Sequence, residues 1–146
     1  MDLYKKILVP IDGSESSLKA LNHAVTLAKI HKSTITVLSV IDELKLPFGA
    51  EFNLWARESH NELIRTTLES INQELVKIRK YEPEIPLDPE IKEGNPAKVI
   101  AQMATEEEYD LIIMGKKGLG IVEELVMGSV ARKVVDLSEV PVTIIP

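Results

Sequence analysis

Four short runs rich in apolar or β-branched residues and a poorer fifth run, separated by segments with helical spacing, constrain the fold of this chain most strongly. The first run, Ile7-Leu8-Val9, is continuous and apolar, as expected of a strand buried on both faces of a parallel sheet. The second, residues 34–40, is rich in β-branched side chains and also favours a strand. Three further strands are predicted at residues 87–92, 110–114 and 142–145.

The segments between these strands carry helix signals. Serines at 14, 16 and 17 supply cap candidates for a first helix that ends near residues 31–33. A long helix is predicted from about Asn53 to Arg79, after a loop marked by Pro47 and Gly49. Its apolar positions form one stripe suited to packing against a sheet: Ile64, Leu68, Ile71, Leu75 and Ile78. A third helix begins at the proline of Gly94-Asn95-Pro96 and buries Val99, Ile100 and Met103.

Strands and helices alternate as βαβαβαβαβ, which favours a single doubly wound α/β domain over residues 1–146. Such a domain has a five-stranded parallel sheet with helices on both faces. Pro89 lies within the predicted third strand, and proline cannot donate to a ladder on both sides. We therefore expect the third strand at an edge of the sheet.

The stretch from Met114 to Val130 carries most of the chemical information. Gly115 and Gly118 follow the predicted fourth strand, and Gly128-Ser129 comes after nine more residues. Glycine tolerates positive φ and permits close approach to the main chain, and bare amides in such a loop can bind anions. Ser129 is a candidate N-cap for a helix over residues 130–137, whose start would be a phosphate site. We expect Val130, Val134 and Leu137 on the buried side of this helix.

The pattern Gly115-x2-Gly118-x9-Gly128-Ser129 resembles the nucleotide-binding motif of ATP-binding universal stress proteins. The resemblance extends to residues 6–14 at one end of the chain and residues 141–145 at the other, and it is weakest between about Asp42 and Pro86. Taken singly, Gly115 and Gly118 could simply end a strand, and Gly128-Ser129 could be an ordinary helix start. Their joint spacing, with Asp12 available after the first strand, favours a nucleotide site.

The resemblance implies a Rossmann-like fold of the adenine nucleotide alpha hydrolase-like type, with strand order 3-2-1-4-5. The implied ligand is ATP, with or without Mg²⁺ or Mn²⁺. Pro10 and Asp12 would lie at the sugar, Val40 would meet adenine through its main chain, and Met114 and Gly115 would border the ribose. The implied phosphate contacts are Gly118, Gly128, Ser129 and Val130. Lys117 is a further phosphate candidate, although lysine lacks the planar bidentate grip of arginine.

Composition excludes several other functions. The chain has no cysteine, which rules out disulfides and thiolate chemistry and suits a reducing cytoplasm. Its formal charge of −6 argues against nucleic-acid binding, which depends on cationic neutralisation of phosphates. No apolar stretch reaches the roughly 18 residues of a membrane helix, and the N-terminus lacks a signal-peptide plan. We expect a cytoplasmic protein with no membrane partner.

The leading functional hypothesis is an ATP-binding regulatory or stress-response protein with little or no hydrolysis. The sequence contains no P-loop, no identifiable catalytic base and no metal-binding cluster, although Glu123 or Glu124 could approach a bound metal. One alternative is an enzyme that hydrolyses or transfers adenine nucleotides. Another is a nucleotide-free dimer module with a vestigial pocket.

The last predicted strand, Val142–Ile145, favours self-association. It is short and apolar, and no later segment covers it. An exposed strand edge pairs readily with another chain, and the resemblance also implies a homodimer. We expect a two-fold homodimer through this strand.

Overall fold

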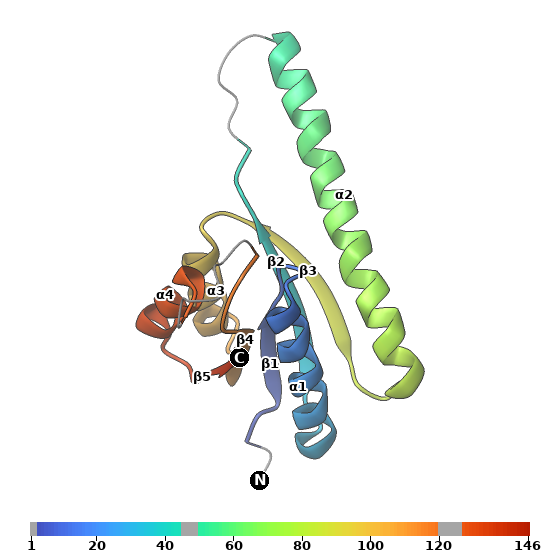
Figure 1. Ribbon diagram of the computed structural model, residues 1–146, viewed down its shortest axis with the longest axis vertical. Helices are drawn as coiled ribbons and strands as arrows, with labels where there is room; N and C mark the ends of the chain where they lie inside the picture. Colours follow the sequence, from blue (N-terminus) through green and yellow to red (C-terminus); the bar gives the residue numbers. More distant parts are fainter. Residues whose placement is uncertain (1–2, 45–49, 120–126) are drawn as a thin grey trace.

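The computed structural model describes residues 3–44, 50–119 and 127–146. The described residues form an alternating series of strands and helices (Figure 1). In chain order these are β1 (Lys6–Pro10), α1 (Glu15–His31), β2 (Thr34–Ile41), α2 (Ala50–Tyr81), β3 (Leu87–Glu93), α3 (Pro96–Glu106), β4 (Leu111–Gly115), α4 (Ser129–Leu137) and β5 (Val142–Ile145).

The sheet has the strand order β3-β2-β1-β4-β5, and every pair is parallel, which confirms the predicted fold. β3 lies at an edge, as Pro89 predicts. Pro89 pairs with Val37 of β2, and no other strand of the described residues lies on its other side. β1 lies between β2 and β4, so the direction in which successive strands are added reverses at β1.

Two apolar layers cover the sheet because successive strand residues point to opposite faces. Ile7 and Val9 of β1 join a core with α1 and α2, whereas Leu8 between them joins a core with α3 and α4. All three side chains are fully buried. The two cores together hold β1 at the centre of the molecule, where it supports the residues that follow its carboxyl end.

Helix α2 packs against the sheet over only part of its length. Ile71 and Leu75 are buried and Ile64 and Ile78 are half-buried, but Leu68 is 36% exposed, so the predicted stripe is wrong at Leu68. Figure 1 shows that the N-terminal half of α2 projects past the end of the sheet. The helix also begins at Ala50, earlier than predicted, while Pro47 and Gly49 lie outside the described residues. Apolar residues at helical spacing therefore do not by themselves show that this part of α2 packs against the sheet.

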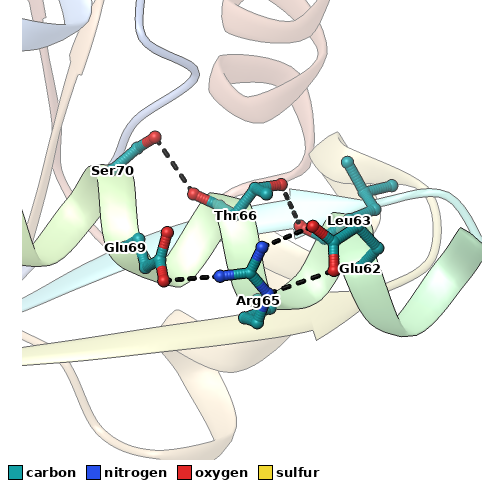
Figure 2. Close-up of polar contacts among 6 residues, drawn as sticks. All are labelled: Glu62, Leu63, Arg65, Thr66, Glu69 and Ser70. Carbon is teal, nitrogen blue, oxygen red and sulfur yellow. Dashed lines mark hydrogen bonds and ion pairs between the residues drawn. The ribbon is translucent and has the colours of Figure 1, made fainter.

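The solvent-facing side of α2 is held by local polar contacts (Figure 2). Arg65 Nη1 donates to Glu69 Oε1 at 2.7 Å, and Arg65 Nε donates to Glu62 Oε2 at 3.1 Å. The two carboxylates raise the pKa of Arg65, and Arg65 lowers the pKa of Glu62. The Ser70 hydroxyl donates to the Thr66 carbonyl oxygen at 3.0 Å. These i,i+3 and i,i+4 contacts support a helix that has few tertiary partners at this point.

Helix α4 buries Val134 as predicted, but not the other two predicted residues. Ala131 and Val134 are buried, whereas Val130 is 37% and Leu137 is 50% exposed, so the prediction is wrong for Val130 and Leu137. Ala131 and Val134 are one helical turn apart, and a short helix at the edge of a layer needs only that narrow stripe. In the described part of the chain, none of the helices has the length and apolar character needed to span a membrane.

Candidate functional site

A pocket of about 350 Å³ lies beyond the carboxyl ends of β1 and β4. In open α/β sheets this reversal point is where ligands usually bind. The pocket is lined by Pro10, Ile11, Asp12, Ser14, Ser17, Leu38, Val40, Pro96, Ile100, Met114, Gly115, Lys116, Lys117, Gly118, Leu119, Gly128, Ser129, Val130 and Ala131. All ten residues that the sequence predicts for the site are therefore found around one cavity.

The turn after β1 forms one wall of the pocket. The Ser14 amide donates to Asp12 Oδ1 at 2.9 Å, and Ser14 caps α1 by accepting from the Ser17 amide at 3.3 Å. The Leu119 amide donates to Asp12 Oδ2 at 3.2 Å. Asp12 thus joins the start of α1 to the loop that follows β4.

Gly115 is required because β4 ends against the start of α1. A Cβ at this position would lie 2.5 Å from Ser16 Oγ and 2.7 Å from the Ser16 carbonyl carbon. It would also lie 2.8 Å from the Ser17 amide nitrogen. Two of these three atoms belong to the backbone and cannot rotate away, so this glycine serves the packing of α1 on the loop.

Gly118 is close to a side chain instead. A Cβ there would lie 2.7 Å from Asp12 Oδ2. Neither Gly115 nor Gly118 has positive φ, because the described glycines with positive φ are Gly13 and Gly94. Glycine can be favoured in such a loop because other atoms approach closely or because the backbone has positive φ. Only the close approach of other atoms applies at Gly115 and Gly118.

The N-terminus of α4 forms the opposite wall. Gly128, with φ −69° and ψ 158°, occupies the N-cap position, and no side chain caps the helix. The prediction that Ser129 is the N-cap is therefore wrong, because Ser129 is already the first helical residue. Ser129, Val130 and Ala131 all line the pocket. The first amides of a helix have no partners within it and carry the positive end of its dipole, so this wall suits an anion.

The two glycine segments are joined through Lys116. Its amide donates to the Ile145 carbonyl oxygen at 2.7 Å, and its carbonyl oxygen accepts from the Gly128 amide at 2.8 Å. These bonds hold the loop after β4 between the end of β5 and the start of α4. Lys116 and Lys117 add positive charge to this side of the pocket.

The other end of the pocket is apolar. It is lined by Leu38, Val40, Pro96, Ile100 and Met114, of which Leu38, Ile100 and Met114 are buried. A cavity with an apolar end and a cationic, amide-rich end fits a ligand that combines a flat heterocycle with an anionic group.

The main chain of Val40 faces this apolar end. The Ile11 amide donates to the Leu38 carbonyl oxygen at 2.8 Å, so the polar groups of Leu38 point toward β1. The Ile41 carbonyl oxygen accepts from the Gly94 amide on the β3 side at 2.9 Å. Because main-chain groups alternate along a strand, those of Val40 point to the β1 side, where β1 has already ended. They can hydrogen-bond to a ligand.

No metal-binding group emerges from the part of the chain that the structure describes. These residues contain no cluster of three or more histidine, aspartate or glutamate side chains that could hold an ion. Glu123 and Glu124, which the sequence offers as metal neighbours, lie outside the described residues.

Several residues of the pocket are absent from the sequence-based prediction. Ser14 and Ser17 come from the cap of α1, and Pro96 and Ile100 come from the start of α3. The Gly94-Asn95-Pro96 turn is a sequence signal for a helix start. Helix starts after strands lie at the carboxyl end of a parallel sheet, so that signal could have placed Pro96 near the site.

These features define a doubly wound α/β protein with a ligand pocket at the reversal point of its sheet. The sequence model described as "Universal stress protein family" matches residues 3–146. A universal stress protein of Methanocaldococcus jannaschii, MJ0531, is 35% identical over 147 residues, which cover 99% of this chain and 83% of that protein. The chain therefore belongs to the universal stress protein family.

Solved structures share the fold of this chain. The universal stress protein UspA from Lactobacillus plantarum superposes with a TM-score of 0.86 at 26% identity, covering 98% of each chain. A universal stress protein in complex with cAMP superposes with a TM-score of 0.65 at 23% identity. That match covers 98% of this chain and 97% of the other.

Proposed function

We propose that this protein binds an adenine nucleotide, ATP in the first place, in the pocket between β1 and β4. The observation that carries the proposal is the meeting of two unlike surfaces in one cavity. The N-terminus of α4, where Gly128 provides no capping side chain, supplies amides for phosphates. The opposite end of the cavity supplies apolar side chains for a base. The related protein whose structure contains cAMP supports a ligand of this chemical class.

The residue roles follow the two ends of the cavity. The Val40 main chain reads the adenine edge, while Met114 and Gly115 border the ribose. Asp12 and Pro10 lie at the sugar, where a carboxylate can accept from ribose hydroxyls. The phosphates contact the amides of Gly118 and Val130, together with Gly128 and the Ser129 hydroxyl, and Lys117 offsets their charge. A Mg²⁺ or Mn²⁺ ion would be bound through the phosphates of the nucleotide, which are common ligands of Mg²⁺.

We infer that the protein holds the nucleotide and acts as a regulatory protein. Asp12 is the one carboxylate among the described residues that line the pocket. Both of its oxygens already accept hydrogen bonds from main-chain amides, at 2.9 Å and 3.2 Å. A general base must be free to take a proton from the attacking water, so these bonds oppose a hydrolytic role for Asp12. Slow turnover or none is expected.

The nucleotide content of freshly purified protein tests this function. After denaturation, mass spectrometry of the released small molecules should find unhydrolysed ATP at about one molecule per chain, the stoichiometry of a single site. Incubation with ATP and Mg²⁺ should release little phosphate. Rapid turnover would support the hydrolase alternative, and failure to retain or rebind any nucleotide would contradict the proposal.

We further propose a homodimer through β5. This strand is at the edge of the sheet, and all four of its residues are half-buried in the single chain. Its outer main-chain groups have no neighbouring strand among the described residues. Pairing with a second copy would satisfy those groups and cover the remaining apolar surface.

A further inference from the structure

Ser16 contacts both main-chain polar groups of Lys117. The Ser16 hydroxyl donates to the Lys117 carbonyl oxygen at 2.5 Å, and the Lys117 amide approaches Ser16 Oγ at 3.3 Å. The Ser14 hydroxyl lies 3.3 Å from the same carbonyl oxygen. Ser16 is the second residue of α1, so its side chain joins the start of that helix to a loop 101 residues further along the chain.

The approach of Ser16 depends on Gly115. A Cβ at Gly115 would occupy the space of Ser16 Oγ, at a separation of 2.5 Å. A glycine at the end of β4 therefore admits the hydroxyl that holds Lys117.

The contact with Lys117 fixes the orientation of Gly118. The Lys117 carbonyl and the Gly118 amide belong to one planar peptide unit, and no described peptide bond is cis. In a trans peptide the C=O and N–H bonds point in opposite directions. With its carbonyl oxygen held toward Ser16, this peptide unit directs the Gly118 N–H away from α1. Gly118 itself lines the pocket.

We propose that Ser16 is a positioning residue for the phosphates of the bound nucleotide. This inference rests on the proposed function, because it assigns the Gly118 amide to a phosphate oxygen. Ser16 acts through the peptide unit between Lys117 and Gly118 and is not among the residues that line the pocket. Its effect should therefore depend on the phosphates of the ligand and not on the base.

Calorimetric titration of ligand-free protein with ATP and, separately, with adenosine tests the role. Ser16→Ala should weaken ATP binding at least about fivefold, the change expected on losing one hydrogen bond, and leave adenosine affinity unchanged. Ser16→Thr keeps the hydroxyl and should recover most of the ATP affinity. Thr26→Ala is the matched control, because Thr26 lies on the same helix and its hydroxyl donates within that helix, to the Asn22 carbonyl oxygen at 3.3 Å.

Hydrogen exchange supplies a second readout that needs no ligand. The Lys117 amide of the free protein should exchange faster in Ser16→Ala than in wild type when followed by NMR. Equal ATP affinity of wild type and Ser16→Ala would overturn the inference, as would an equal loss of ATP and adenosine affinity or an unchanged Lys117 exchange rate. Failure of the proposed function looks different, because wild-type protein itself would then bind no ATP.

Discussion

The Gly128 amide donates to the Lys116 carbonyl oxygen at 2.8 Å, and this bond places the start of α4 against the loop that follows β4. Two glycine segments that are separated in sequence thereby face one cavity. The bond uses the amide of the N-cap residue, so the amides of the first helical turn remain directed at the pocket.

Gly128→Val should remove nucleotide binding without unfolding the protein. Gly128 has extended backbone angles, φ −69° and ψ 158°, which valine adopts readily. The added side chain would occupy space at the phosphate end of the cavity. We expect ATP affinity to fall at least about tenfold, or about 1.4 kcal/mol, by calorimetry. A thermal melt close to that of wild type is the control, and unchanged ATP affinity in a folded variant would refute the assignment of Gly128.

Gly115→Ala and Gly118→Ala should differ in their effect on stability. The new Cβ at Gly115 meets the backbone of Ser16 and Ser17 within 2.8 Å, and overpacking of this kind costs about 2 kcal/mol. Among the described residues, the new Cβ at Gly118 meets the end of the Asp12 side chain, which can shift by weakening its hydrogen bonds to the Ser14 and Leu119 amides, so a smaller loss of about 1 kcal/mol is expected. Urea denaturation measures both free energies of unfolding. Equal losses would contradict the close packing of α1 on the end of β4.

We predict that ionisation of Tyr109 lowers the stability of the folded protein at alkaline pH. Its hydroxyl donates to Thr36 Oγ1 at 2.8 Å, and burial raises its pKa above the ordinary value. A raised pKa in the folded state means that the stabilisation is complete below about pH 10, the ordinary tyrosine value, and is lost as pH rises through the folded-state pKa. Tyr109→Phe should cost about 1 kcal/mol near pH 8, because it leaves the buried Thr36 hydroxyl without this partner.

The same variant should show a weaker fall in stability between about pH 9 and pH 11, the range around the ordinary tyrosine pKa. Urea denaturation across this range measures the difference. Tyr81→Phe provides the control, since Tyr81 is 82% exposed on α2. A pH profile of Tyr109→Phe that runs parallel to wild type would contradict the assignment of the alkaline loss to this buried hydroxyl.

Ile144→Lys should convert a dimer to a monomer. Ile144 lies on β5, paired with Met114 of β4 on one side and with no strand on the other among the described residues. A charge on this edge opposes pairing with a second copy. Sedimentation velocity should show a dimer for wild type and a monomer for the variant. Val76→Lys, at a site 51% exposed on α2, adds the same charge elsewhere and should remain dimeric. A dimeric Ile144→Lys protein would exclude β5 as the interface.

The family resemblance implies the strand order and the residues of the pocket, and several signals in the residues themselves agree with both. Buried strands such as Ile7-Leu8-Val9 have apolar residues on both faces, and Pro89 can occupy only an edge. Asp12 and Gly118 follow strands that are neighbours in the sheet, so the fold alone brings them together.

Where the sequence-based predictions are wrong, the position of the residue is set by tertiary contacts that a periodic pattern does not reveal. Ser129 is a good N-cap residue by type, yet the helix begins one residue earlier because the Gly128 amide is held by Lys116. Leu68 fits the apolar stripe of α2, yet its side chain is 36% exposed. The contact of Ser16 with Lys117 joins residues 101 positions apart, which spacing along one helix does not reveal.

Calorimetric titration of ligand-free wild-type protein with ATP and Mg²⁺ tests the central claim most directly. The account predicts saturable binding with one ATP per chain. It also predicts that the Gly128→Val protein, folded as judged by its thermal melt, weakens this binding at least about tenfold. A wild-type protein that is folded and yet gives no binding heat at any of several temperatures would contradict the account.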